Sequence, residues 1–272
     1  MPFRGWQRAG PARAATQGRI NVIITIGVFI VLTIATAAFV LAPRMFEPRL
    51  VFDAKPDPPA AFGYQMSWLA IRTNDTARVA EVLMLDLAEA ANWRTGIGTV
   101  YDERVGQGRV YLTPPVNGWT FVVGLSLPQP LSRGFVDKCT PMLLDLAASF
   151  PEAQYYACFP SLDLFAWARV ADGKLVRAFA MGDEGVLWNK GRPTREERGL
   201  GFKFGEVKGV KGRKSDVGPP MPVYPTEAQV MHLASCWSLD PTSLTGTRSD
   251  PGLGYVCAVP GQWRPERLRR TG

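Results

Sequence analysis

The sequence LFAWARVADGKLVRAFAMGDEGVLWNKG, at residues 164–191, predicts a run of antiparallel strands. Its apolar segments are separated first by Asp172-Gly173, a pair typical of a tight hairpin turn. A second reversal follows at 182–185, where glycines begin and end the turn. We expect the strands at 162–171, 175–181 and 186–188.

A helix and a strand precede this run. Thr140 is a good N-cap and Pro141 suits the first helical position, so a helix should begin here. A similar order of elements is expected earlier in the chain, where Asn74 and Asp75 are capping candidates for another helix. The strands expected outside 162–188 are 64–72, 93–101, 109–113, 119–125 and 153–158.

The order β-α-β-β-β followed by α-β-β-β-β predicts an α+β domain. We expect a largely antiparallel sheet with the helices packed on one face, and the repeated order raises the possibility of two similar halves. Thr194 and Thr226 each begin a capping box, and the second predicts a last helix that ends before Asp240-Pro241. The basic glycine-containing loop at 203–214 fails the spacing of a phosphate-binding loop and is read as a solvated loop.

An apolar run, NVIITIGVFIVLTIATAAFVLA, occupies residues 21–42 and contains no charged residue. Its length predicts one transmembrane helix, because about 20 apolar residues span a bilayer. A cleaved export signal, with a small-x-small site at 35–37, is the alternative reading. Basic residues in excess on the N-terminal side predict a cytoplasmic N-terminus and an exported C-terminal domain. These are Arg4, Arg8, Arg13 and Arg19.

The chain therefore divides into five predicted parts. The folded part is long enough for one domain with a substantial core. The segment before it is rich in proline, which predicts a spacer. That spacer could instead lie along the domain as an edge segment. The parts are a disordered basic tail (1–19), the transmembrane helix (20–42), the proline-rich spacer (43–61), the α+β domain (62–263) and a basic tail (264–272).

The net charge of +7 does not point to nucleic acid. Four arginines in residues 1–19 and a net three positive charges in residues 264–272 account for all of it. The part between them sums to zero, so it lacks the basic surface that binding to phosphates requires.

Five phrases of the sequence carry a resemblance: MSWLAIR (66–72), PPVNGWTFVVG (114–124), LFAWARVADGKLVRAFAMGDEGVLWNKG (164–191), TREERGLGF (194–202) and CWSLDPTSL (236–244). Across about residues 62–245 the chain resembles a family of uncharacterised bacterial proteins. The resemblance implies a common domain but brings no reaction and no catalytic residues with it. It also implies that the anchor, the basic loop and the four cysteines are additions to that domain.

Catalytic and metal-binding patterns are weak. His232, the only histidine, has Cys236 four residues later, but further zinc ligands at a suitable spacing are missing, so we expect no metal and no cofactor. No G-x-S-x-G elbow is present. Acidic residues that could act as a catalytic pair are more typical of turns: Asp102, Glu103, Asp163, Asp183 and Glu184. The tryptophans that could line a groove are more typical of a core: Trp68, Trp93, Trp119, Trp167, Trp188 and Trp237.

The four cysteines all follow the apolar run. An even set in an oxidising compartment tends to form disulfides. Local geometry favours Cys139–Cys158, joining a helix start to the next strand, and Cys236–Cys257, joining the last helix to the returning segment. Four buried free thiols are the alternative.

The sequence predicts a single-pass protein of the bacterial inner membrane with a periplasmic or extracellular domain. Its partners would be the lipid bilayer, through the N-terminal helix, and a protein or peptide near the membrane, with an immunity-type role included. Whether it is an enzyme is open, and a role without catalysis is favoured. The alternative is a carboxylate-dependent hydrolase of envelope polysaccharide.

Overall fold

The computed structural model describes residues 24–37, 52–131, 134–201 and 224–268. The chain divides into two compact units, Met1–Val51 and Phe52–Gly272, and each is described by itself. The basic loop at 203–214 lies outside the described residues.

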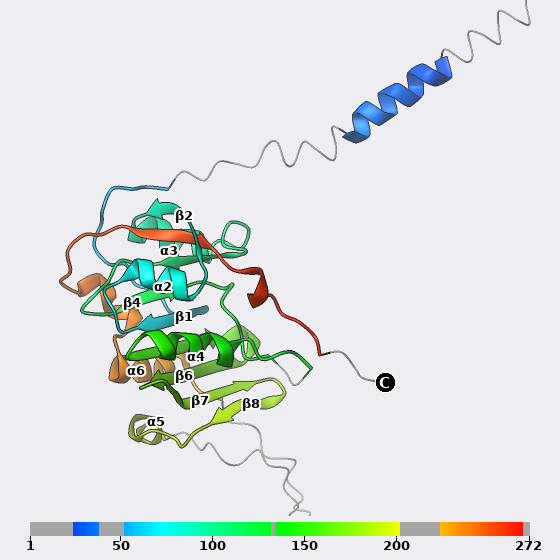
Figure 1. Cartoon of the computed structure of the whole chain (residues 1–272). Helices are drawn as coiled ribbons and strands as arrows, with labels where there is room; N and C mark the ends of the chain where they lie inside the picture. Colours follow the sequence, from blue (N-terminus) through cyan, green and yellow to red (C-terminus); the bar gives the residue numbers. More distant parts are fainter. Residues whose placement is uncertain (1–23, 38–51, 132–133, 202–223, 269–272) are drawn as a thin grey trace, which may run out of the picture. The chain divides into compact units, whose positions relative to one another are not determined.

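The second unit is built on one antiparallel sheet, in which the described residues form nine strands (Figure 1). Their order is β2-β9-β3-β4-β1-β5-β6-β7-β8. The bounds are β1 Met66–Ile71, β2 Asp86–Ala91, β3 Arg109–Leu112, β4 Thr120–Val123, β5 Glu152–Phe159, β6 Leu164–Ala171, β7 Lys174–Gly182, β8 Gly185–Lys190 and β9 Gly254–Ala258.

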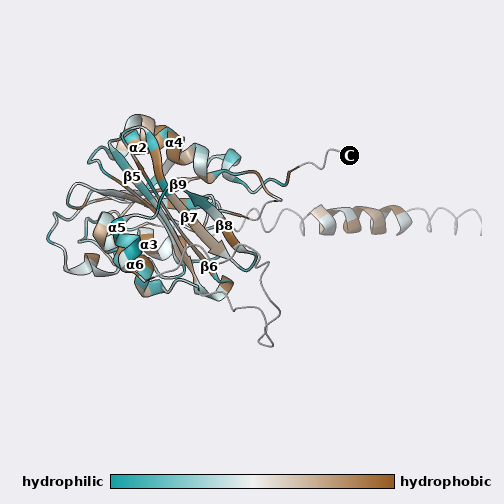
Figure 2. Cartoon of the chain, turned by 90° about the horizontal axis from the view of Figure 1, so that it is seen from below, coloured by the Kyte–Doolittle hydropathy of each residue, from teal (hydrophilic) through white to brown (hydrophobic). Residues whose placement is uncertain are grey.

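Helices cover both faces of this sheet (Figure 2). Helices α2 and α4 lie on one face, and α3, α5 and α6 lie on the other. The bounds are α2 Thr76–Val82, α3 Trp93–Tyr101, α4 Cys139–Ser149, α5 Arg195–Gly199 and α6 Glu227–Trp237, with the 3-10 helices η1 Pro160–Leu162, η2 Pro241–Gly246 and η3 Gly261–Trp263.

The expectation that all helices pack on one face is therefore wrong, and strand β5 shows why. All eight of its residues are buried. Tyr155 and Ala157 pack into the core beneath α2 and α4, whereas Tyr156 and Cys158 pack into the core beneath α3 and α6. A strand that buries both faces needs a covering layer on each side. We refer to these as the α4-side core and the α6-side core.

The expected two similar halves are not seen either. Strands β5 to β8 form a simple meander in chain order. The other five strands are interleaved: β1 lies between β4 and β5, and β9, near the C-terminus, lies between β2 and β3. This second pattern has no counterpart in the meander.

The expected strand at 93–101 is helix α3. The Asn92 side chain accepts a hydrogen bond from the backbone N–H of Thr95, as an N-cap does. The Asp57 carboxylate accepts from the N–H groups of Trp93 and Arg94 at 2.7 and 3.0 Å. Asp57 comes from the segment read as a spacer, so residues 52–61 belong to the folded unit.

Residues 24–37 form a helix in the first unit. Within the described part of the chain, no helix is both long enough and apolar enough to cross a membrane. The expected transmembrane helix is therefore not found there. Residues 21–23 and 38–42 of the apolar run lie outside the described residues.

Candidate binding groove

A groove of about 360 Å³ opens on the α4 side of the folded unit. Three parts of the chain form it: the end of α2, the start of α4 and the C-terminal segment around η3. Its walls are mostly apolar, with two carboxylates and one ammonium group among them. The lining residues are Val82, Leu83, Met84, Val136, Asp137, Lys138, Pro141, Met142, Asp145, Gln262 and Trp263.

The first wall ends in an unusual helix terminus. After the C-cap Leu83, Met84 has φ = 52°. Its N–H donates to the carbonyl of Glu81 at 3.0 Å, and the N–H of Leu85 donates to that of Ala80 at 2.8 Å. These are the two hydrogen bonds of a Schellman motif, in which the left-handed position is usually glycine.

Met84 therefore occupies a strained position and exposes a large side chain. A non-glycine residue in the left-handed region costs about 1 kcal/mol, and 55% of Met84 is exposed at the edge of the groove. Burial in the core does not offset this cost. Strain at an exposed position is an indication of function.

The second wall is the start of α4, which is held by Asp137. Its carboxylate accepts from the N–H groups of Cys139 and Thr140, both at 3.0 Å. The helix thus begins at Cys139, two residues before the expected first helical residue Pro141. From it Met142 supplies buried apolar surface, while the side chain of Asp145 is exposed and makes no hydrogen bond or ion pair within the described residues.

The third wall is the C-terminal segment. Trp263 is buried in the α4-side core. Beyond it the chain pairs with residues 134–136: the N–H of Val136 donates to the Glu266 carbonyl, and the N–H of Leu268 donates to that of Gly134, both at 2.8 Å. Residues 264–268, expected to belong to a basic tail outside the α+β domain, are therefore part of the folded unit.

The charged side chains at the edge of the groove differ in whether they have a counter-ion. The Lys138 ammonium lies 3.0 Å from the Glu266 carboxylate, which neutralises it. Lys190 lies 3.8 Å from Asp137, a longer and exposed pair that contributes little. Asp145 stays without a counter-ion within the described residues, so the edge is weakly acidic.

The acids considered for catalysis lie apart from the groove. Asp102 accepts from the N–H groups of Arg104 and Val105, and these hydrogen bonds lower its pKa. Asp183 accepts from the N–H of Glu184 in the β7–β8 turn. Asp163 is the left-handed residue that ends η1. Each acts as a turn residue, and within the described residues none of the hydrogen bonds or ion pairs brings the side chains of two of these acids together.

Sequence reasoning missed the two most buried carboxylates. Glu197 of α5 accepts from Arg177 Nε at 2.8 Å and from Trp167 Nε1 at 2.7 Å. Glu152 accepts from Arg169 Nε at 2.7 Å. The capping box at Thr194 marked Glu197 as a capping residue. Its ion-pair partner, Arg177, lies on strand β7 and could not be inferred from that local pattern. Each of these carboxylates forms an ion pair with an arginine.

The six tryptophans considered as groove residues are all buried. Trp188 belongs to the α4-side core and the other five belong to the α6-side core. The groove instead uses Trp263, which the sequence did not mark.

The cysteines are all free thiols in the structure. Cys139 and Cys257 lie in the α4-side core, and Cys158 lies in the α6-side core. Cys236 is exposed on α6, on the same side as Cys158. The sheet therefore separates the members of each predicted pair, Cys139–Cys158 and Cys236–Cys257, and neither disulfide is formed.

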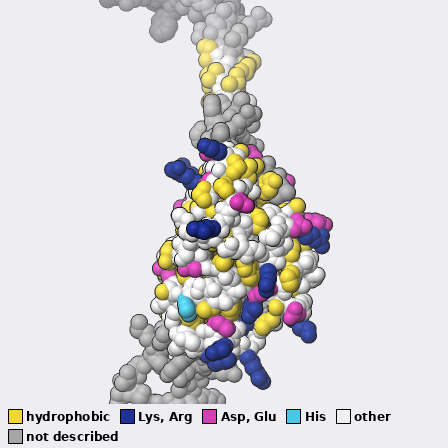
Figure 3. Space-filling model, turned by 90° about the vertical axis from the view of Figure 1, so that its left-hand side faces the viewer, with side chains coloured by type: hydrophobic (Ala, Val, Ile, Leu, Met, Phe, Trp, Pro, Cys, Tyr) yellow, Lys and Arg dark blue, Asp and Glu magenta, His cyan; other side chains and the backbone are white. Residues whose placement is uncertain are grey.

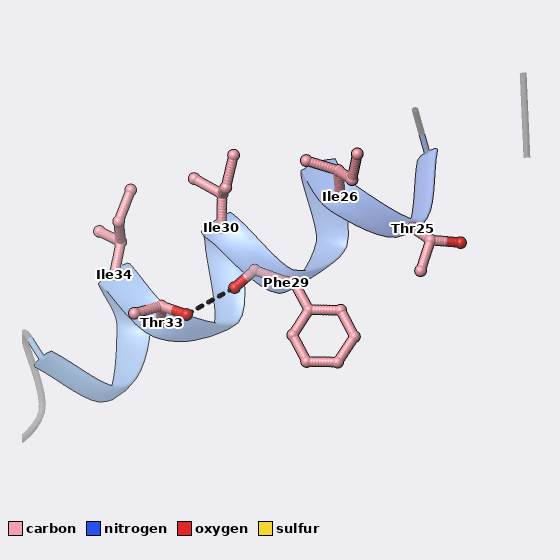
Figure 4. Close-up of a pocket in the computed structure, with 6 residues that line it drawn as sticks. All are labelled: Thr25, Ile26, Phe29, Ile30, Thr33 and Ile34. Carbon is pink, nitrogen blue, oxygen red and sulfur yellow. Dashed lines mark hydrogen bonds between the residues drawn. The ribbon is translucent and has the colours of Figure 1, made fainter. Parts of the chain in front are cut away.

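The helix at 24–37 exposes large apolar side chains along its length, and Figure 4 shows four of them. Ile26, Ile30 and Ile34 follow one another along it, and Phe29 projects to another side. The Thr33 hydroxyl donates to the carbonyl of Phe29 at 2.8 Å. That of Thr36 donates to the carbonyl of Leu32 at 2.8 Å. These hydroxyl groups therefore need no partner outside the helix.

No protein-family model, no curated protein and no solved structure matches this chain. The class of protein rests on the fold and the groove alone: a nine-stranded antiparallel sheet within the described residues, with helices on both faces and an open apolar groove on the α4 side. The resemblance to a family of uncharacterised bacterial proteins stays a prediction.

Proposed function

We propose that this is a membrane-associated protein whose folded unit binds a protein or peptide partner in the groove beside Met84. The observation that carries the proposal is Met84 itself: a large apolar side chain, exposed at 55%, at a helix end where glycine would be less strained. Methionine is also a side chain that adapts to varied apolar partners.

The partner presents an apolar side chain next to a basic residue. The apolar part suits Met84, Met142 and Trp263, which line the groove. The basic part suits Asp145, whose charge has no counter-ion within the described residues. The groove's lysine is already paired with Glu266 and would not favour an acidic partner strongly.

Lipid is the second partner, through the apolar run at 21–42. The helix at 24–37 supports this, because its large apolar side chains are exposed and the hydroxyl groups of Thr33 and Thr36 are satisfied within the helix. The excess of arginine before the run supports a cytoplasmic N-terminus and a periplasmic or extracellular folded unit.

The hydrolase alternative is not favoured by a specific observation. The carboxylates named for it act in separate turns, and the buried ones are paired with arginine. A role in binding needs no such pair of acids.

The groove is tested with two short synthetic peptides that differ only in the residues flanking a central leucine, lysine in one and glutamate in the other. Anisotropy of a fluorescent label reports binding to the full chain in detergent micelles. We expect the lysine peptide to bind up to about fivefold more tightly, a difference of about 1 kcal/mol, because Asp145 is exposed. Asp145→Asn should reduce the difference.

Glu81→Gln provides a matched control, because Glu81 is exposed and pairs with Arg78 rather than lining the groove. Equal binding of the two peptides, or binding that is unchanged by Asp145→Asn, would overturn the assignment of the groove to a basic, apolar segment.

A further inference from the structure

The four thiols differ in their access to solvent. Three are buried, and burial raises the pKa of Cys139 well above its ordinary value and that of Cys158 and Cys257 to about 12. A thiol reacts as its thiolate. These three thiols are therefore protected from reaction, because they are buried and because they keep their protons. Cys236 is the exposed exception.

The position of Cys236 follows from the way α6 packs. The Thr226 capping box begins the helix, and Leu233, Ala234 and Trp237 are buried against the sheet. Residues 232, 235 and 236 therefore face solvent. Figure 3 shows the chain's only histidine, in cyan, on the surface of the folded unit.

A basic group stands next to this thiol. His232 lies one helical turn before Cys236, and its Nε2 is 3.7 Å from the sulfur. Within the described residues, neither side chain has another hydrogen bond or ion pair through its ring or its sulfur. The imidazole is thus free to take a proton from the thiol, as a general base does.

A metal site is a poorer explanation of this pair. No group of three or more His, Cys, Asp or Glu side chains suited to a metal occurs within the described residues. A structural disulfide is also a poor explanation of this thiol, because the sheet separates Cys236 from Cys257.

We propose that Cys236 is a site of thiol–disulfide exchange with small-molecule disulfides, and that His232 is the base that activates it. The imidazole takes the thiol proton, and the Cys236 sulfur attacks one sulfur of the small disulfide. The new S–S bond forms as the old one breaks, and its electron pair leaves on the second sulfur. That thiolate takes the proton back from the imidazolium. The chain gains one mixed disulfide, and one small thiol is released.

The experiment uses the reduced full chain in detergent micelles with oxidised glutathione as the probe. Intact mass gives the number of additions with time, and peptide mass mapping gives the position. We expect a single addition at Cys236, with Cys139, Cys158 and Cys257 unmodified. Cys236→Ser should abolish the addition.

The role of His232 is tested with His232→Gln, which should slow the addition about tenfold or more in the folded chain. Ser235→Ala is the matched control, since Ser235 is exposed in the same turn and its hydroxyl donates to a backbone carbonyl rather than to the sulfur. It should react at the unaltered rate.

A second comparison separates local chemistry from folding. In strong denaturant His232→Gln and the unaltered chain should react at the same rate at Cys236, because the helical spacing is lost. An addition first at another cysteine, or equal rates for folded His232→Gln and the unaltered chain, would overturn the proposal.

Discussion

The Arg177 guanidinium and the Glu197 carboxylate form an ion pair at 2.8 Å in which both side chains are fully buried. Arg177 comes from the strand β7 and Glu197 from the five-residue helix α5. Arg177 Nη1 also donates to the Asn189 side chain at 2.7 Å. This pair therefore attaches a short helix, which is weak by itself, to the sheet.

Replacing Glu197 should be strongly destabilising, because it leaves the buried Arg177 charge without its carboxylate. We expect Glu197→Ala to lower the free energy of unfolding by about 3–5 kcal/mol. Urea unfolding of the full chain in detergent measures it. Glu196→Ala, in the same turn but not fully buried, should cost less than about 1 kcal/mol. Similar losses for the two variants would contradict a structural role for the pair.

Met84→Gly should separate stability from binding. Glycine removes the strain of the left-handed position, so we expect the free energy of unfolding to rise by up to about 1 kcal/mol. Binding of the lysine-flanked peptide should weaken, because an apolar contact is lost. Asn117→Gly is the control, since Asn117 also has φ = 50° but lies outside the groove. A glycine at 84 that leaves peptide affinity unchanged would argue against the role of Met84.

Removal of residues 264–272 should weaken the groove while the sheet stays folded. Trp263 remains, but the hydrogen bonds of Val136 and Leu268 and the Lys138–Glu266 ion pair are lost. We expect lower affinity for the lysine-flanked peptide with a nearly unchanged far-ultraviolet circular dichroism spectrum. Unaltered affinity after truncation would show that the third wall contributes nothing.

The buried thiols predict a loss of stability at alkaline pH. Burial raises the pKa of Cys257 from about 9 to about 12, so the folded chain holds the proton more tightly than the unfolded chain. The stabilising contribution is complete below about pH 9 and is lost as the pH rises towards 12. Urea unfolding at pH 8 and pH 10.5 should show the decline. Cys257→Ala should be less stable at pH 8 but lose less on going to pH 10.5, and an identical decline would exclude this thiol as a cause.

The side of the membrane on which the folded unit lies stays a prediction that fusions can test. A reporter active only outside the cytoplasm, joined after Gly272, should be active, and a reporter active only in the cytoplasm should be silent. Exchanging Arg4, Arg8, Arg13 and Arg19 for neutral residues should weaken this preference. The opposite reporter pattern in the unaltered chain would refute the proposed location.

The sequence by itself determined the elements whose signals are local. The Asp172-Gly173 turn and its flanking apolar segments predict β6 and β7, which pair in the structure. The capping boxes at Thr194 and Thr226 predict the starts of α5 and α6, and both are formed. Such signals act within a few residues, so no knowledge of the rest of the fold is needed.

Only the tertiary structure decided the remainder. Strand β9 enters between β2 and β3, the carboxylate that caps α3 comes from Asp57, and the groove joins the ends of α2 and α4 to Trp263. In each case the partners are far apart in the chain, and their contact depends on strand order and on which face a helix covers. Alternation along β5 shows that both faces are buried, but packing in three dimensions selects which helices cover them.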